Sequence, residues 1–187
     1  MVRNVTEIMA ISGSLRSLSV NTAVLRAASI LAPEDVRITL YRNLGSIPVF
    51  NPDIEDTNPP AVLDFRAQLS AADALMIASP EYAHGVTGVL KNALDWAVGS
   101  EEFDGKPVAL INTSIRATHA YAALAETIAT MGGKIVPGAS LIVPLPSNTL
   151  DVDAILALPE LVDPIRRAVE AMSDACSAVV SAKSGVS

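Results

Sequence analysis

The chain of 187 residues has only one cysteine and two histidines. Cys176 has no second cysteine to pair with, which excludes an internal disulfide and a cysteine-rich metal site. His84 and His119 lie far apart in the sequence without ligand partners nearby, so we expect no bound metal. Cys176 falls in a row of apolar residues with helical spacing, which predicts a small core or interface residue.

The chain also has few basic residues and no basic stripe. Its Lys and Arg total 13 against 20 Asp and Glu, which gives a formal net charge of −7 and a pI of about 4.7. Such a chain would not neutralise a phosphate backbone, so no nucleic-acid partner is expected. No apolar run is long enough to predict a membrane span. The apolar run after Glu7 is too short for a secretory signal, and a cytoplasmic location is expected.

Aromatic residues make up only 4% of the chain, whereas hydrophobic residues make up 50%, with a mean hydropathy of +0.40. A parallel sheet covered on both faces, together with a subunit interface, would bury this apolar excess. The length fits a single domain over residues 1–187, and neither an internal repeat nor a linker interrupts it.

Short apolar runs mark the expected strands. Nearly continuous apolar runs occupy residues 8–11, 74–78 and 108–111. Such runs are typical of interior parallel strands that are buried on both faces. Residues 36–41 alternate apolar and polar side chains, which predicts an edge strand. A fifth strand is expected within residues 135–143, although Pro137 and Gly138 blur its start.

Helical patterns separate these runs. Apolar stripes with helical spacing occupy residues 24–31, 62–69, 89–97 and 121–128. A last helix is predicted from about residue 153 into the tail, with a break or restart at Pro159 or Pro164. Residues 44–60 are rich in Pro, Asn and Asp, which predicts a loop long enough to lie over the mouth of a site.

The alternation of strands and helices predicts a doubly wound α/β sheet with right-handed crossovers. Because the second strand has the pattern of an edge strand, the order 2-1-3-4-5 is favoured over a Rossmann order. In such a sheet the ligand crevice opens at the carboxyl ends of the first and third strands. The loops at those ends, residues 13–22 and 79–88, should therefore lie side by side.

The first of these loops, GSLRSLSVNT, has the features of a phosphate site. Gly13 allows a sharp turn, Arg16 supplies a positive fork, and the following helix presents unpaired N–H groups to an anion. The loop lacks the GxGxxG pattern of dinucleotide-binding turns and the GK[ST] ending of P-loops. It suits one terminal phosphate, such as that of a mononucleotide cofactor. The alternative is an ordinary serine-rich helix cap.

The second loop, SPEYAHGVTG, has the features of a site for a flat ligand. Gly85 and Gly88 let the backbone approach such a ligand, and Tyr82 offers an aromatic edge or face. Exposed backbone N–H groups beside a planar ring can bond the polar rim of a heterocycle. The alternative is a βα loop whose tyrosine packs on its own helix.

Together, GSLRxxSxN and SPEYxxxxxGxLKNALDW resemble the NADPH-dependent FMN reductase family, which includes quinone, azo-dye and chromate reductases. The resemblance implies a flavodoxin-like three-layer sandwich with a five-stranded parallel sheet in the order 2-1-3-4-5, and bound FMN. The residues that it places at the cofactor are Ser14, Arg16, Ser19, Asn21 and Thr22 at the phosphate, Pro80, Glu81, Tyr82, Ala83, His84 and Gly85 at the flavin ring, and Ser114 and Arg116 in a third loop.

Two positions depart from the family pattern. Many members carry proline where this chain has Thr87, and the third loop usually reads Ser-Pro where this chain has Ser114 and Ile115. Both changes would alter ring contacts or nicotinamide access without removing the phosphate site. The resemblance also implies a homodimer or homotetramer, with the helix that carries Trp96 at a subunit interface.

The activity that the resemblance implies is that of an FMN-dependent NAD(P)H oxidoreductase. NADPH or NADH would deliver hydride to flavin N5, and free flavin, a quinone, an azo compound or chromate would then take the electrons in the same slot. A shared slot implies ping-pong kinetics. Because the flavin would carry the redox chemistry, no catalytic side chain is expected. Two alternatives stay open: a flavodoxin-type electron carrier without nicotinamide turnover, and an α/β scaffold without flavin. The sequence leaves open the acceptor and the preference between NADPH and NADH.

Overall fold

The computed structural model describes residues 5–99, 101–143, 145 and 149–184. Their central sheet has the order β2-β1-β3-β6-β7, and β8 also pairs with β6. The strands are β1 (Thr6–Ser12), β2 (Val36–Leu40), β3 (Ala74–Ala78), β6 (Pro107–Asn112), β7 (Lys134–Ile135) and β8 (Leu141–Ile142). All of these pairs are parallel. The predicted order and the predicted edge strand, β2, are confirmed.

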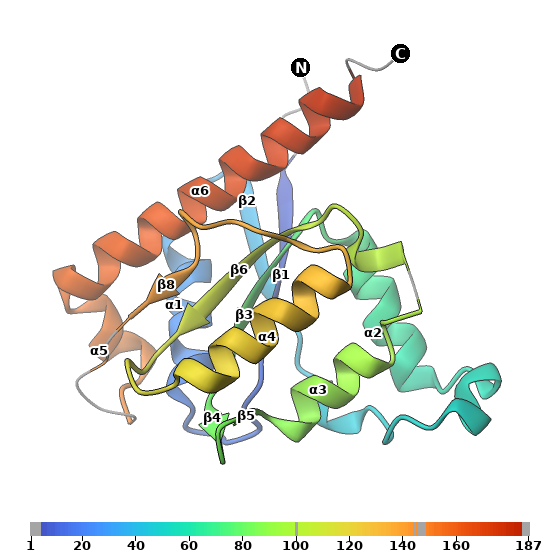
Figure 1. The fold of residues 1–187 in the computed structure, drawn as a ribbon. Helices are drawn as coiled ribbons and strands as arrows, with labels where there is room; N and C mark the ends of the chain where they lie inside the picture. Colours follow the sequence, from blue (N-terminus) through green and yellow to red (C-terminus); the bar gives the residue numbers. More distant parts are fainter. Residues whose placement is uncertain (1–4, 100, 144, 146–148, 185–187) are drawn as a thin grey trace.

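Helices cover both faces of the sheet, so the fold has three layers (Figure 1). One layer holds α1 (Val20–Leu31), α5 (Val152–Leu156) and α6 (Pro159–Ser184), and the other holds α2 (Pro60–Ala71), α3 (Gly88–Asp95) and α4 (Thr118–Thr130). Successive strand residues point to opposite faces. Ile8 and Ala10 of β1 therefore join the core beneath α1 and α6, while Met9 and Ile11 join the core beneath α2 and α3.

The predicted fifth strand is divided into β7 and β8. Pro137 has no N–H to donate, and the backbone instead turns, with the Ser140 N–H bonded to the Val136 carbonyl at 2.9 Å. The Ser140 hydroxyl accepts the N–H of Leu110 at 3.2 Å. A side chain thus takes over a contact that an unbroken strand would make with β6.

The predicted C-terminal helix is interrupted after α5 and begins again as α6 at Pro159. Pro159 is one of the two prolines at which a break or restart was predicted. Proline suits this first position because the N–H that it lacks would have no partner within the helix. Pro164 lies inside α6, which continues through it. Cys176 is buried in the core, as predicted. Within the described residues, no helix is long and apolar enough to cross a membrane.

The loop expected over a site mouth lies elsewhere. Residues 44–60 contain two short 3₁₀ helices, η1 (Leu44–Ser46) and η2 (Pro52–Thr57), and none of these residues lines the pocket described below. The side chain of Asn92 on α3 accepts the N–H of Phe50 at 2.7 Å and donates to the Pro48 carbonyl at 2.9 Å. These bonds hold the segment against α3, away from the pocket.

Trp96, at the end of α3, also contacts this segment. Its indole N–H donates to the Pro48 carbonyl at 2.8 Å, and its ring packs edge-on against Phe50. The residue is 3% exposed, so its own side chain is buried within the chain. Lys91 and Asp95, four residues apart on α3, form an ion pair.

Candidate functional site

Three loops meet at the carboxyl ends of β1, β3 and β6. We call residues 13–19 the first loop, residues 79–87 the second loop and residues 113–117 the third loop. Gly13 makes the first contact: its N–H donates to the Ala78 carbonyl at 2.8 Å. A Cβ on Gly13 would lie 2.4 Å from the Ser79 hydroxyl oxygen and 2.8 Å from the Ser79 Cβ, so any other residue would force the two loops to shift. Glycine therefore lets the first and second loops touch, as the predicted strand order requires.

The three loops enclose a pocket of about 360 Å³. It is lined by these predicted site residues: Ser14, Arg16, Ser19, Asn21, Pro80, Glu81, Tyr82, Ser114 and Arg116. It is also lined by residues outside the predicted set: Val20, Ser79, Asn112, Thr113, Ala117 and Leu145. Ser79 directly follows the apolar run of β3, and Asn112 directly follows the apolar run of β6. Their place at the carboxyl ends of these strands could have predicted that they line the pocket. Leu145 has no comparable signal, because it reaches the pocket from beyond β8.

The first loop presents hydroxyl groups and a helix terminus to this pocket. Ser19 is the N-cap of α1, and its hydroxyl oxygen accepts the N–H of Thr22 at 3.4 Å. Ser14 Oγ accepts the N–H of Arg16, also at 3.4 Å. Thr22 does not line the pocket, because its hydroxyl lies 2.8 Å from that of Ser12 behind the loop. Thr22 thus supports the loop from behind.

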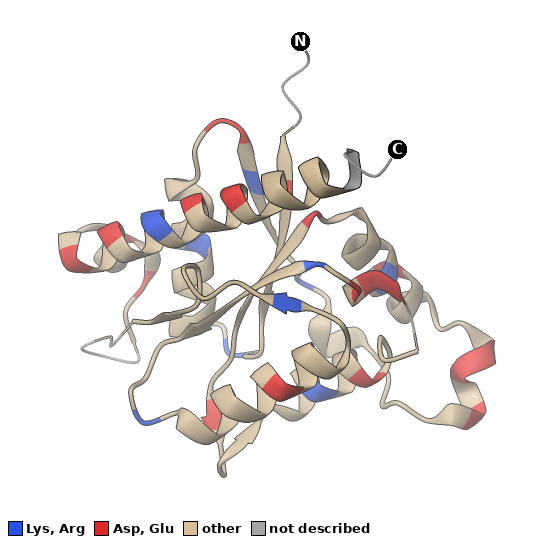
Figure 2. Ribbon diagram, turned by 45° about the horizontal axis from the view of Figure 1, so that its top comes forward, with Lys and Arg blue, Asp and Glu red and all other residues tan. Residues whose placement is uncertain are grey.

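The pocket is positively charged in an acidic protein. Arg16 and Arg116 line it, and neither pairs with a carboxylate among the described residues. The first turn of α1 contains no acidic residue, so its positive end is not neutralised. Apart from Glu81, the acidic residues lie outside the pocket lining, and many of them lie along α6 and around η2 and η3 (Glu101–Phe103) (Figure 2). This arrangement favours an anionic ligand.

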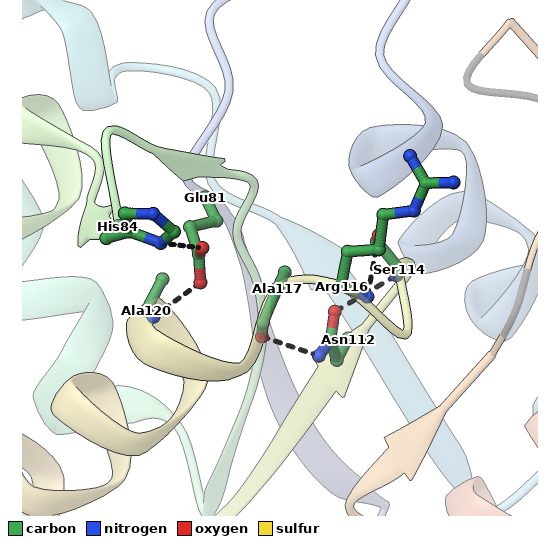
Figure 3. Close-up of polar contacts among 7 residues, drawn as sticks. All are labelled: Glu81, His84, Asn112, Ser114, Arg116, Ala117 and Ala120. Carbon is green, nitrogen blue, oxygen red and sulfur yellow. Dashed lines mark hydrogen bonds and ion pairs between the residues drawn. The ribbon is translucent and has the colours of Figure 1, made fainter.

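Asn112, at the end of β6, shapes the third loop. Its side-chain oxygen accepts the N–H of Ser114 at 3.0 Å, and its amide donates to the Ala117 carbonyl at 2.9 Å (Figure 3). The Thr113 hydroxyl donates to the Asn21 side-chain oxygen at 3.1 Å. The third loop is therefore tied both to its own strand and to the start of α1.

The second loop contains a hairpin formed by β4 (Glu81–Tyr82) and β5 (Gly85–Val86). Ala83 and His84 connect the strands with φ angles of 49° and 59°, a conformation that L-residues rarely adopt. The Tyr82 side chain is 56% exposed at the pocket. Ala83, His84 and Gly85, which the resemblance places at the flavin ring, do not line the pocket.

The carboxylate of Glu81 points away from Arg116 and toward α4 (Figure 3). One oxygen accepts the Ala120 N–H at 2.8 Å, and the other lies 3.1 Å from Nδ1 of His84. The bond from Ala120 and the two nearby histidines hold the pKa of this carboxyl below its usual value. His84 and His119, distant in the sequence, meet with ring centroids 4.4 Å apart.

Thr87 lies where the second loop meets the first. The residue is 3% exposed, and its hydroxyl has no hydrogen-bond partner among the described residues. Its φ of −60° and ψ of 141° are angles that proline also adopts. The backbone at this position is therefore compatible with proline, although this chain carries threonine.

Comparison with known proteins supports the predicted class. The family model described as NADPH-dependent FMN reductase matches residues 6–145. An NAD(P)H-dependent FMN reductase of Pseudomonas aeruginosa is 47% identical over 58% of this chain and 60% of that protein. A 2-hydroxy-1,4-benzoquinone reductase of a Burkholderia species is 39% identical over 59% of this chain and 62% of that protein. The chain thus spans about three fifths of the length of these curated relatives.

A solved structure agrees with the fold. The flavoenzyme NAD(P)H:(acceptor) oxidoreductase FerB of Paracoccus denitrificans aligns with a TM-score of 0.74 and 24% identity, over 92% of this chain and 98% of that one. This level of identity establishes a shared fold and no more. The family match spans most of the chain and includes all three loops of the pocket. The chain therefore belongs to the NADPH-dependent FMN reductase family.

Proposed function

We propose that the protein is an FMN-dependent oxidoreductase that takes electrons from NADPH or NADH and passes them to a small organic acceptor. The observation that carries the proposal is that two kinds of loop line the same pocket. The first loop offers Arg16 and hydroxyl groups to an anion, and the second loop offers the exposed ring of Tyr82. The names of its relatives, an FMN reductase and a benzoquinone reductase, favour free flavin or a quinone as the acceptor.

The residues of the first loop fit the phosphate of FMN. Arg16 supplies a charged fork, Ser14 and Ser19 supply hydroxyl groups, and the start of α1 supplies unpaired N–H groups. Arg116 adds a second positive charge from the third loop. No acidic side chain opposes these groups, since the Glu81 carboxylate is bonded to Ala120 and His84. A dianionic phosphate matches this donor set.

The second and third loops fit the rest of the cofactor. Pro80 and Tyr82 of the second loop and Ser114 and Ala117 of the third loop line the pocket together with the first loop. When bound, FMN would supply the redox chemistry by accepting hydride and releasing electrons to the acceptor. The part of the protein is to orient the ring, to leave one side accessible, and to place backbone N–H donors near its polar edge.

One accessible side implies that nicotinamide and acceptor use the same space in turn. Tyr82, Ile115 and Leu18 are all more than half exposed, so apolar and aromatic surface borders the approach to the pocket loops. Parallel double-reciprocal plots of initial rate against NADPH, at several quinone concentrations, are the expected outcome. Intersecting lines would contradict the shared space.

The test of the proposed function is the anaerobic addition of NADPH, and separately of NADH, to protein loaded with FMN. Loss of the yellow absorbance with at least one of them, and its return on addition of 1,4-benzoquinone, is the expected result. Absence of bleaching with both would contradict the proposal. A large one-electron reduced population during redox titration would instead favour an electron carrier.

We also propose that the protein is a homodimer or homotetramer. Apolar side chains that are exposed in the single chain support this proposal, with Leu18 at 72%, Val49 at 82% and Val98 at 60%. Analytical ultracentrifugation measures the mass directly. A single species at 19.5 kDa would contradict it.

A further inference from the structure

The first turn of α4 has no capping side chain of its own. Ala117 is the N-cap residue, and it has no side-chain oxygen that could accept from the free N–H groups at the start of the helix. The N–H of Ala120, in that first turn, instead donates to Glu81 of the second loop at 2.8 Å. A carboxylate at a helix N-terminus also interacts favourably with the helix dipole. Glu81 thus performs from another loop what a serine or aspartate N-cap normally does.

The other oxygen of Glu81 reaches the turn of its own hairpin. It lies 3.1 Å from Nδ1 of His84, and the His84 ring packs edge-on against His119 of α4. The Glu81 side chain is 12% exposed, whereas that of His84 is 76% exposed. The carboxylate is therefore the shielded centre of a contact between the hairpin and the helix.

The hairpin needs such a contact because its turn is strained. Ala83 and His84 both have positive φ, although neither is glycine or asparagine, the residues that favour this two-residue turn. An isolated two-stranded hairpin is marginal in water even with a favourable turn. Contacts with α4 therefore have to hold this one in place.

We propose that Glu81 is a positioning residue that fixes the second loop to the third across the pocket. The third loop leads directly into α4, so the bond from Ala120 to Glu81 sets how far Tyr82 stands from Ser114 and Arg116. The tie complements the bond between Thr113 and Asn21, which joins the third loop to the start of α1. The effect of this hydrogen bond on FMN binding rests on the proposed function, whereas the bond between the two loops does not.

The test uses the full chain without added ligand and compares Glu81→Ala, Glu81→Gln and Glu126→Ala. Glu126 is an exposed acid on the same helix, which makes it a matched control. Amide exchange at Ala120 is expected to rise roughly tenfold or more in Glu81→Ala. ¹⁵N relaxation should show the Tyr82 amide becoming more mobile in the same variant. Glu126→Ala should match the wild type in both measurements.

Glu81→Gln keeps an acceptor for Ala120 but loses the charge, so we expect it to fall between Glu81→Ala and the wild type. This variant carries the test if Glu81→Ala does not fold. Exchange at Ala120 within twofold of the wild type in the variants would overturn the proposed tie. Faster exchange at Ala120 with an unchanged Tyr82 amide would show a helix cap without a positioning role, and would overturn it as well.

A separate titration with FMN then measures the consequence for the pocket. Glu81→Ala should bind FMN several-fold more weakly than Glu126→Ala and should shift the visible spectrum of the bound flavin. Unchanged affinity and spectrum would overturn the positioning role. If the wild type binds no FMN, the proposed function fails, and the exchange and relaxation data still decide whether Glu81 ties the two loops.

Discussion

At the scale of single residues, the buried hydroxyl of Thr87 has no hydrogen-bond partner among the described residues. A buried hydroxyl without a partner destabilises a folded protein by about 1–3 kcal/mol. Thr87 lies between Gly13 and the start of α3, where the first and second loops touch. Its side chain fills space at this junction, so its shape matters there and its polarity does not.

Thr87→Val should therefore stabilise the protein. Valine keeps the branched shape and removes the unpaired hydroxyl, and we expect the free energy of unfolding to rise by about 1 kcal/mol. Urea unfolding followed by circular dichroism measures this change. Thr39→Val, at an exposed position on β2, is the matched control and should stay within about 0.5 kcal/mol of the wild type. A loss of stability in Thr87→Val would show that the hydroxyl has a partner.

The motifs predicted which loops line the pocket, but they did not predict which way every side chain of these loops points. Ser14, Arg16 and Tyr82 line the pocket because their loops follow strand ends that the topology brings together. Thr22 turns to Ser12, and His84 turns away through a positive φ. Neither direction is encoded in the spacing of the motif, because one depends on a contact with Ser12 outside it and the other on the backbone angle of the hairpin turn.

At the scale of elements, the shape of residues 44–60 depends on α3. Asn92 makes hydrogen bonds to the backbone at Phe50 and Pro48, and Trp96 makes another to Pro48. The residues between the two short 3₁₀ helices of this segment need such anchors, because their backbone polar groups would otherwise lack partners. The LKNALDW segment is therefore explained by structure rather than by direct contact with a ligand.

Asn92→Ala should release this segment. Loss of the hydrogen bonds to Phe50 and Pro48 is expected to lower the free energy of unfolding by about 1–3 kcal/mol. Limited proteolysis should also cut faster within residues 44–60. Lys91→Ala removes only the neighbouring surface ion pair and should cost about 0–1 kcal/mol. Equal behaviour of the two variants would contradict the anchoring role of Asn92.

Elements with continuous apolar runs were predictable, and interrupted ones were not. Strands β3 and β6 are buried along their whole length, so composition alone locates them. The fifth position in the sheet divides into β7 and β8 because Pro137 breaks the ladder and Ser140 replaces the missing contact. The β4–β5 hairpin was not expected, since Ala83 and His84 are poor residues for its turn.

At the scale of the whole molecule, one carboxylate links stability to pH. The pKa of Glu81 in the folded protein lies below its usual value of 4.5 because Ala120 and the histidines favour its charged form. Glu81 therefore contributes stability that is fully present above about pH 4.5. This contribution decreases as the pH falls through the lowered pKa of the folded state.

Comparison of the wild type with Glu81→Gln across pH 2–7 tests this linkage. The difference in free energy of unfolding should shrink as the pH falls below about 4.5, because the Glu81 carboxylate becomes protonated whereas glutamine does not titrate. Chemical unfolding at each pH measures the difference. A difference that grows as the pH falls would have the wrong sign for a lowered pKa.

The central claim concerns the molecule as a whole: a positive cradle at the first loop of an acidic protein binds the phosphate of FMN. Fluorescence titration with FMN, on the wild type and on Arg16→Ala combined with Ser19→Ala, tests it most directly. Removing a charged and a neutral donor should weaken binding roughly hundredfold. Arg37→Ala, which removes an exposed arginine on β2, should bind as the wild type does. Equal FMN affinity for the double variant and the wild type would contradict the account.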